Sequence, residues 1–70
     1  EVNMSIEQSS LLQEKWDQLK VLIETLEVDI QKNIGGNKSA GVRARKGLRL
    51  LKTNASEIVK TSLACDKDRQ

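Results

Sequence analysis

The chain has 70 residues, 31% of them charged, with one Trp, one Cys and no Phe, Tyr, His or Pro. This composition argues against a β-sheet, which favours aromatic residues, and the absence of His and of a metal-ligand cluster argues against an enzyme, a cofactor or a metal site. The net charge of +2 is unevenly divided, because residues 1–34 carry seven acidic and three basic side chains whereas residues 35–70 carry nine basic and three acidic ones.

A first amphipathic helix is predicted over about residues 6–34. Ser5 and Ser10 each stand three residues before a glutamine, which is a capping-box pattern, so either serine fits its start. Val21 and Val28 lie roughly opposite its apolar seam, either as scattered surface residues or as a second contact surface. The seam itself repeats at alternating spacings of 4 and 3, as in helices that pack on partner helices: Leu12, Trp16, Leu19, Ile23, Leu26 and Ile30.

Two glycines, Gly35 and Gly36, are predicted to end this helix, because glycine takes the left-handed conformation at little steric cost. Either Asn37 or Ser39 can cap the helix that follows. The predicted turn covers residues 35–38, and so short a link places two long helices antiparallel as neighbours.

A second helix is predicted over about residues 39–64, followed by a frayed tail at 65–70. Gly41 and Gly47 in its interior indicate either close approach of another helix or phosphate backbone, or simple tolerance. Cys65 is interpreted as a small seam residue rather than a reactive thiol. The seam again alternates 4 and 3: Ala44, Leu48, Leu51, Ala55, Ile58, Ser62 and Cys65.

The predicted fold is therefore all-α, a single domain at 1–70 formed by an antiparallel helical hairpin. A chain of this length supplies only a few kcal/mol of core stability, so we expect a helical bundle, a four-helix dimer or larger. The residues expected to form this core or oligomer seam are Leu12, Trp16, Leu19, Ile23, Leu26, Ile30, Leu48, Leu51 and Ile58.

A run of cations begins directly after the turn. Arg45, Arg49 and Lys52 follow i, i+4, i+7 spacing and share a helical face, while Arg43 and Lys46 lie on the outward side and Lys38 at the turn. Cations on a rigid helix neutralise the phosphates of a nucleic acid, with release of counterions and without reading the bases. The same pattern also fits a solvated face whose cations pair with the acidic side chains of the first helix, so composition and spacing leave both interpretations open.

The segment Gly36–Lys46 reads Gly-Asn-Lys-Ser-Ala-Gly-Val-Arg-Ala-Arg-Lys. It closely resembles the Gly-Asn-Lys-small-Ala-Gly/Ala-x-Arg-x-Arg-Lys segment of the chlamydial-type bacterial histone-like proteins, a linker-histone-like nucleoid family. The family also has an acidic amphipathic helix before this motif, so the resemblance covers most of residues 10–63. It implies non-specific DNA binding, with these cations as contacts: Lys38, Arg43, Arg45 and Lys46 from the motif, and Arg49 and Lys52 from its basic continuation.

The leading hypothesis is a non-enzymatic, nucleoid-associated, histone-like protein of the bacterial cytoplasm that binds DNA through its second helix. We expect it to need no cofactor and no small-molecule substrate. We also expect no membrane, since no apolar run approaches the roughly 18 residues of a membrane span. The alternative is a structural or adaptor hairpin that mediates oligomerisation or binds another protein. That alternative predicts that the cations lie near Glu14, Asp17 or Glu24 of a neighbouring chain.

Overall fold

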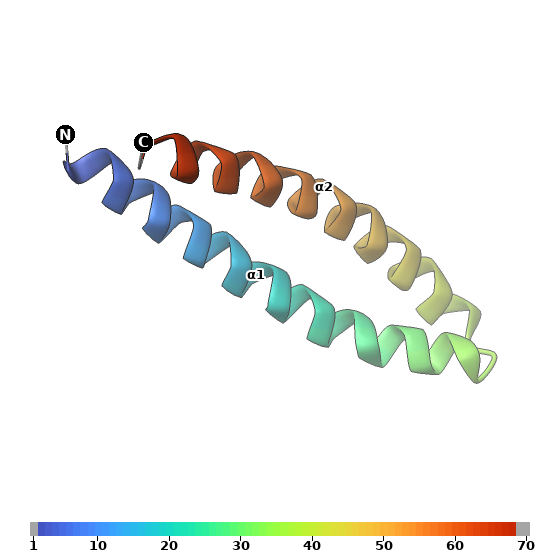
Figure 1. Ribbon diagram of the computed structural model, residues 1–70. Coiled ribbons are helices and arrows are strands. Elements are labelled where there is room, and N and C mark those ends of the chain that lie inside the picture. Colours follow the sequence, from blue (N-terminus) through green and yellow to red (C-terminus); the bar gives the residue numbers. More distant parts are fainter. Residues whose placement is uncertain (1, 69–70) are drawn as a thin grey trace.

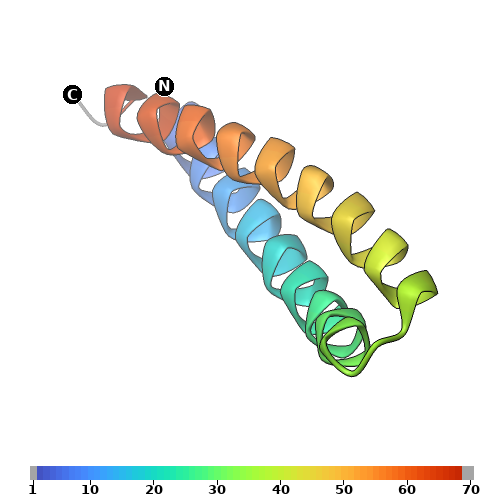
Figure 2. The same ribbon diagram turned by 90° about the vertical axis from the view of Figure 1, so that its right-hand side faces the viewer.

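Two long helices form an antiparallel hairpin in the computed structural model, which describes residues 2–68 and, among their side chains, those of residues 7–68. Helix α1 spans Val2–Ile34 and helix α2 spans Lys38–Asp68. The first turns of α1 and the last turns of α2 lie together and the connecting turn lies at the far end (Figure 1), and a view turned by 90° again shows the two helices running alongside each other (Figure 2). The Cα trace measures 53 × 15 × 11 Å. The predicted all-α helical hairpin is confirmed.

Both helices are longer than the sequence predicted. Helix α1 begins at Val2, so Ser5 and Ser10 lie inside the helix and neither is its cap. Helix α2 continues to Asp68, so residues 65–68 are helical where a frayed tail was expected, and residues 69 and 70 lie outside the described part. No Gly or Pro interrupts either outer end, so the helix, once formed, can continue outward by one hydrogen bond per added residue.

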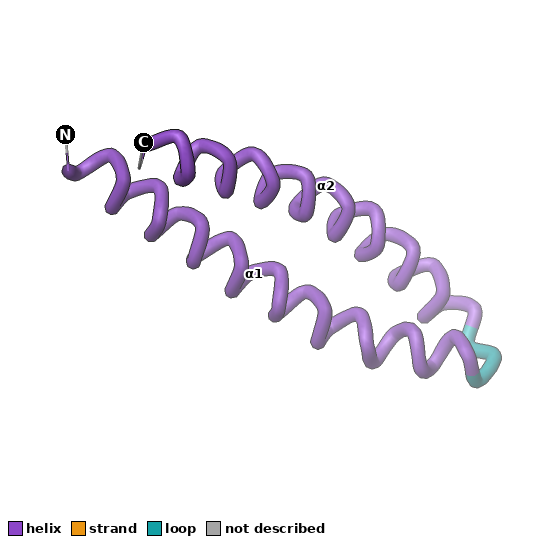
Figure 3. Tube along the Cα trace, viewed as in Figure 1, coloured by secondary structure: helices purple, strands orange, loops and turns teal. Residues whose placement is uncertain are grey.

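The turn, teal in Figure 3, is built by three residues that end one helix and start the next. The Gly36 N–H donates to the Asn33 carbonyl (3.0 Å) and the Asn37 N–H to the Lys32 carbonyl (3.0 Å), the two bonds of a Schellman motif. Gly36 has a φ of 102°, which favours glycine. The Asn37 side chain then accepts the Ala40 N–H at 2.9 Å. Asn37 is therefore the cap of α2, one of the two residues proposed for that role.

Replacing Asn37 by alanine is expected to destabilise the hairpin by about 1 kcal/mol, because the Ala40 N–H loses its acceptor. Ser39→Ala, two residues along in the exposed first turn, is the matched control and should change stability by less than about 0.5 kcal/mol. Urea unfolding followed by circular dichroism at one protein concentration measures both. Equal losses at the two positions would contradict the assignment of Asn37 as the cap.

The two helices meet along a stripe that repeats every 3 and 4 residues on each. We call these residues the interhelical stripe; all are buried or half-buried: Leu12, Lys15, Leu19, Leu22, Leu26 and Asp29 on α1, and Ala40, Ala44, Gly47, Leu51, Asn54, Ile58, Thr61 and Cys65 on α2. The Leu19 and Leu26 side chains are its largest buried members. Cys65 is 2% exposed, with its Sγ 3.4 Å from the Ser9 Oγ, in agreement with its predicted packing role.

Within one chain, this stripe differs from the predicted seam by one residue at every second position. Leu12, Leu19, Leu26, Leu51 and Ile58 lie in the stripe as expected. The other seam residues lie beside it: Trp16, Ile23 and Leu48 are 46, 46 and 43% exposed, Ile30 is half-buried, and Lys15, Leu22, Asp29 and Gly47 take the inner places. The hairpin alone therefore leaves much of the predicted seam uncovered.

Small residues on α2 explain how the helices come so close. A Cβ added to Gly47 would lie 2.6 Å from the Leu26 Cδ2, and one added to Gly41 would lie 2.5 Å from the Asn33 Nδ2. Of the two explanations for these glycines, close approach of another helix is the one the structure supports. No helix in the described residues is long and apolar enough to cross a membrane.

Candidate nucleic-acid interface

The side of α2 that faces away from α1 carries a second regular stripe. Starting at Lys46 and alternating by 3 and 4, its members lie on the opposite side of the helix from the interhelical stripe and are all exposed. We call this set the outer basic stripe: Lys46, Arg49, Thr53, Ser56 and Lys60. It runs about 20 Å along the helix at 1.5 Å per residue.

Two shallow surface hollows follow this stripe. One is lined by Arg43, Lys46 and Arg49 with Gly47, Leu50 and Thr53. The next is lined by Arg49, Lys52 and Lys60 with Thr53, Ser56 and Glu57. The two hollows share Arg49 and Thr53 and therefore adjoin each other. Their combined lining includes four of the six predicted contact cations: Arg43, Lys46, Arg49 and Lys52. Lys38, the first residue of α2, and Arg45 border neither hollow.

Arg43 differs from the other five predicted cations because its charge is engaged within the chain. Its Nε donates to the Asp29 Oδ1 at 3.2 Å, and the Asp29 side chain is only 15% exposed. The half-buried carboxylate needs this partner, so a phosphate that bound Arg43 would have to compete with it. Arg43 therefore joins the two helices as well as bordering the basic surface.

The remaining predicted cations are available to a ligand. Among the described side chains, Lys38, Arg45, Lys46, Arg49 and Lys52 make no ion pair or hydrogen bond with the protein. Residues 38–56 contain no acidic side chain. The nearest one along the helix, Glu57, is paired with Lys15 of α1 at 3.2 Å. The outer face of α2 is thus a positive surface with its nearest acid already neutralised.

Sequence reasoning missed three members of this surface, Thr53, Ser56 and Lys60. Their spacing of 3 and 4 from Lys46 and Arg49 was visible in the sequence, but they fall outside the dense cation run. The Ser56 hydroxyl can donate to a phosphate oxygen, as Ser commonly does at nucleic-acid backbones, whereas the Thr53 hydroxyl donates to the Arg49 carbonyl at 3.3 Å. Lys60 extends the positive surface by two turns beyond Lys52.

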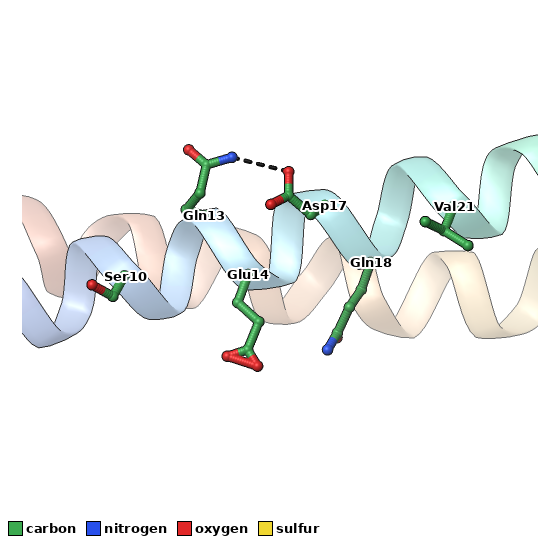
Figure 4. A pocket seen from close by; sticks show the side chains of 6 residues that line it. All are labelled: Ser10, Gln13, Glu14, Asp17, Gln18 and Val21. Atoms are coloured by element: carbon green, nitrogen blue, oxygen red, sulfur yellow. Dashed lines mark hydrogen bonds between the residues drawn. The ribbon is translucent and has the colours of Figure 1, made fainter.

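A hollow on α1 offers no comparable chemistry. Its lining comes from that helix alone: Ser10, Gln13, Glu14, Asp17, Gln18 and Val21. Figure 4 shows Glu14 and Gln18 pointing to one side and Gln13 and Asp17 to the other, where the Gln13 amide donates to the Asp17 carboxylate at 3.0 Å. The described residues also contain no group of three or more His, Cys, Asp or Glu side chains that could hold a metal ion.

Comparison with known protein families gives a match. The profile of the family described as Hc1, histone H1-like protein Hc1, matches residues 13–68, which is most of the chain and covers α1 from residue 13 onward, the turn and all of α2. No curated protein and no solved structure gives a significant match.

Proposed function

Because the chain belongs to the family of the histone H1-like protein Hc1, we propose that it is a nucleoid-associated protein that binds DNA without base specificity. The observation that carries the proposal is the outer face of α2, where unpaired cations line a surface free of competing acids from residue 38 to residue 56. The bacterial cytoplasm, where the nucleoid lies, is the location that this role implies.

Binding at this surface works through charge and position. Lys46, Arg49, Lys52 and Lys60 replace the counterions condensed on the DNA, and the release of those ions drives association. Ser56 supplies a neutral donor between the cations. The Thr53 hydroxyl donates to the Arg49 carbonyl at 3.3 Å, so it would have to exchange that bond for one to a phosphate oxygen. A rigid helix holds these groups in line, so little order has to be created on binding.

The alternative, an adaptor hairpin that uses its cations to pair with other protein chains, has one observation in its favour. Arg43 shows that a cation of α2 can be satisfied by an acid of α1, at 3.2 Å from Asp29. Within one chain, Arg43 is the one predicted contact cation that pairs with an acid, since the other five have no acidic partner among the described residues. DNA is therefore the better-supported ligand.

A salt titration with labelled duplex DNA tests the proposal. Four phosphate contacts predict that the logarithm of the affinity falls with the logarithm of salt concentration with a slope of about −3 to −4. Duplexes of unrelated sequence should bind with affinities within about threefold of one another, because phosphate contacts carry no sequence information. Absence of binding at low salt, or a slope near zero, would reject DNA binding by this surface.

A further inference from the structure

Two ion pairs between described side chains join α1 to α2, and each has its α2 member at the surface proposed for DNA. Arg43 borders one of the two hollows and bonds to Asp29 of α1 at 3.2 Å. Glu57 borders the other hollow and bonds to Lys15 of α1, also at 3.2 Å. The third ion pair between described side chains lies within α1. Helix α1 therefore reaches the proposed DNA surface through Lys15 and Asp29.

The two pairs have opposite effects on the charge of that surface. Glu57 is the single acid in the lining of the two hollows, and Lys15 neutralises it. Arg43 is one of the cations in the same lining, and Asp29 neutralises it. One pair thus removes a charge that repels phosphate, and the other removes a charge that attracts phosphate.

The position of Glu57 shows what Lys15 prevents. Glu57 stands three residues before Lys60 on α2, a spacing at which opposite charges on a helix attract each other. Its carboxylate nevertheless pairs with Lys15, whose side chain is 27% exposed against 52% for that of Glu57, and Glu57 and Lys60 form no ion pair. Without Lys15, the carboxylate would remain at the hollow as a charge that repels phosphate and competes for Lys60. Lys15 therefore keeps Lys60 available to DNA.

The pair of Asp29 with Arg43 is held by the half-buried carboxylate. The Asp29 side chain is 15% exposed and lies in the interhelical stripe, whereas that of Arg43 is 54% exposed. A carboxylate so far removed from water is costly to leave without a cation, so the pair persists in the free protein. Arg43 donates through its Nε and keeps its Nη donors, but the charge of the guanidinium is balanced. A phosphate that touched the paired Arg43 would release few counterions, and their release is what drives association.

Among the described side chains, ion pairing between the helices is limited to these two places. Lys20 pairs with Asp17 at 3.2 Å, and both belong to α1. Asp17 and Lys20 therefore serve as matched controls, because they carry the same charges as Asp29 and Lys15 but form no ion pair with α2. The other described acids of α1 also form no ion pair with α2: Glu7, Glu14, Glu24 and Glu27.

We propose that two residues of α1, Lys15 and Asp29, set the strength with which α2 binds DNA. Lys15 raises the affinity by neutralising Glu57, and Asp29 lowers it by neutralising Arg43. Both are half-buried members of the interhelical stripe, so they act as positioning residues through the α2 side chains that they hold. The DNA surface is then a property of the assembled hairpin and not of α2 alone. This inference rests on the proposed function, since DNA is the ligand whose affinity is set.

Replacing Lys15 by glutamine, in the wild type and in a Glu57→Gln background, tests the role of Lys15. In the wild type, Lys15→Gln should weaken binding of labelled duplex DNA about 3- to 5-fold at about 0.1 M salt, the effect of roughly one phosphate contact. In the Glu57→Gln background it should change the affinity less than about twofold, because no carboxylate remains to be exposed. Lys20→Gln should change the affinity less than about twofold in both backgrounds. Equal losses from Lys15→Gln in the two backgrounds would show that Lys15 acts by its own charge, which overturns its proposed role.

Asp29→Asn tests the role of Asp29, because it removes the charge and keeps a side chain of the same shape. It should strengthen DNA binding about fivefold and make the salt slope steeper by about 0.9, as one added phosphate contact does. Arg43→Gln should abolish both gains, and in the wild type it should leave the slope unchanged. Asp17→Asn should change the affinity less than about twofold. Weaker binding by Asp29→Asn would show that Asp29 holds Arg43 against a phosphate, which overturns its proposed role. Circular dichroism reports whether each variant is helical.

Elution from a heparin column in a salt gradient measures the same charges with a polyanion that is not DNA. Asp29→Asn should elute at higher salt than the wild type and Lys15→Gln at lower salt, with smaller shifts for Asp17→Asn and Lys20→Gln. If these shifts occur but DNA does not bind, the proposed function fails and the control of the surface by α1 stands. If DNA binds and the variants match their controls on both polyanions, the control by α1 fails and the proposed function stands. A wild type that binds neither polyanion at low salt would overturn both.

Discussion

Replacing Lys46, Arg49 and Lys60 together by glutamine lowers the affinity for duplex DNA about 100-fold at about 0.1 M salt, and it reduces the salt slope by about 3 units. The three side chains lie in line on the outer basic stripe and are exposed. Each substitution removes one phosphate contact together with its counterion release, and glutamine is uncharged with nearly the same helix propensity as lysine and arginine. Fluorescence anisotropy over a series of salt concentrations measures the affinity and the slope in one experiment.

The matched control removes the same amount of charge from the other helix. Lys20→Gln, Lys32→Gln and Gln18→Glu, all on α1, together lower the net charge by the same three units and leave the Lys15–Glu57 pair intact. If binding depends on the outer basic stripe, this control should keep an affinity within about fivefold of the wild type and an unchanged slope. Equal losses in the two variants would show that net charge, rather than the surface of α2, determines binding.

The helical hairpin could be predicted from the sequence because local signals agree with the tertiary structure. Gly35 and Gly36 end the helix and Asn37 caps the next, as the structure confirms with a φ of 102° at Gly36 and a 2.9 Å bond to the Asn37 side chain. The outer ends of the helices could not be placed, because no Gly or Pro stands there to mark where a helix starts or stops.

The interhelical stripe was harder to predict than the helices. Hydrophobic periodicity selects bulky apolar residues, and therefore selected Trp16, Ile23 and Leu48. The positions between the two helices, where these bulky residues were expected, are occupied by Lys15, Leu22 and Gly47. Periodicity does not distinguish a surface buried within the chain from one available to a partner, whereas the small residues of α2 determine where the two helices approach.

The clustering of cations at the candidate interface could be predicted from the sequence, but the set of residues that form it could not. The cation run pointed to the part of α2 that carries the unpaired cations, yet one of its members, Arg43, has an acidic partner in α1, 14 residues earlier in the chain. Such a pairing depends on the register of the two helices, which the sequence did not fix. Lys60 was overlooked because it stands eight residues beyond the run and shares only its helical face.

The largest effect on stability is expected at Leu26, which is 6% exposed and lies against the backbone of Gly47. Leu26→Ala should destabilise the hairpin by about 3 kcal/mol, through lost burial and the cavity left at the helix contact. Val28→Ala, at a site that is 53% exposed, is the control and should cost less than about 0.5 kcal/mol. Urea unfolding of the two variants and the wild type is compared at one protein concentration.

Combining Leu26→Ala with Gly47→Ala separates close packing from simple loss of apolar area. In the wild type, a Cβ at position 47 would lie 2.6 Å from the Leu26 Cδ2, and this clash offsets the gain of about 1 kcal/mol in helix propensity. With Leu26 shortened, the new methyl group enters the vacated space, so the double variant should be more stable than Leu26→Ala by about 1–2 kcal/mol. Gly41→Ala meets the exposed Asn33 instead, and its effect should be the same with or without Leu26. Equal effects of Gly47→Ala in both backgrounds would show that the Leu26–Gly47 contact does not set the distance between the helices.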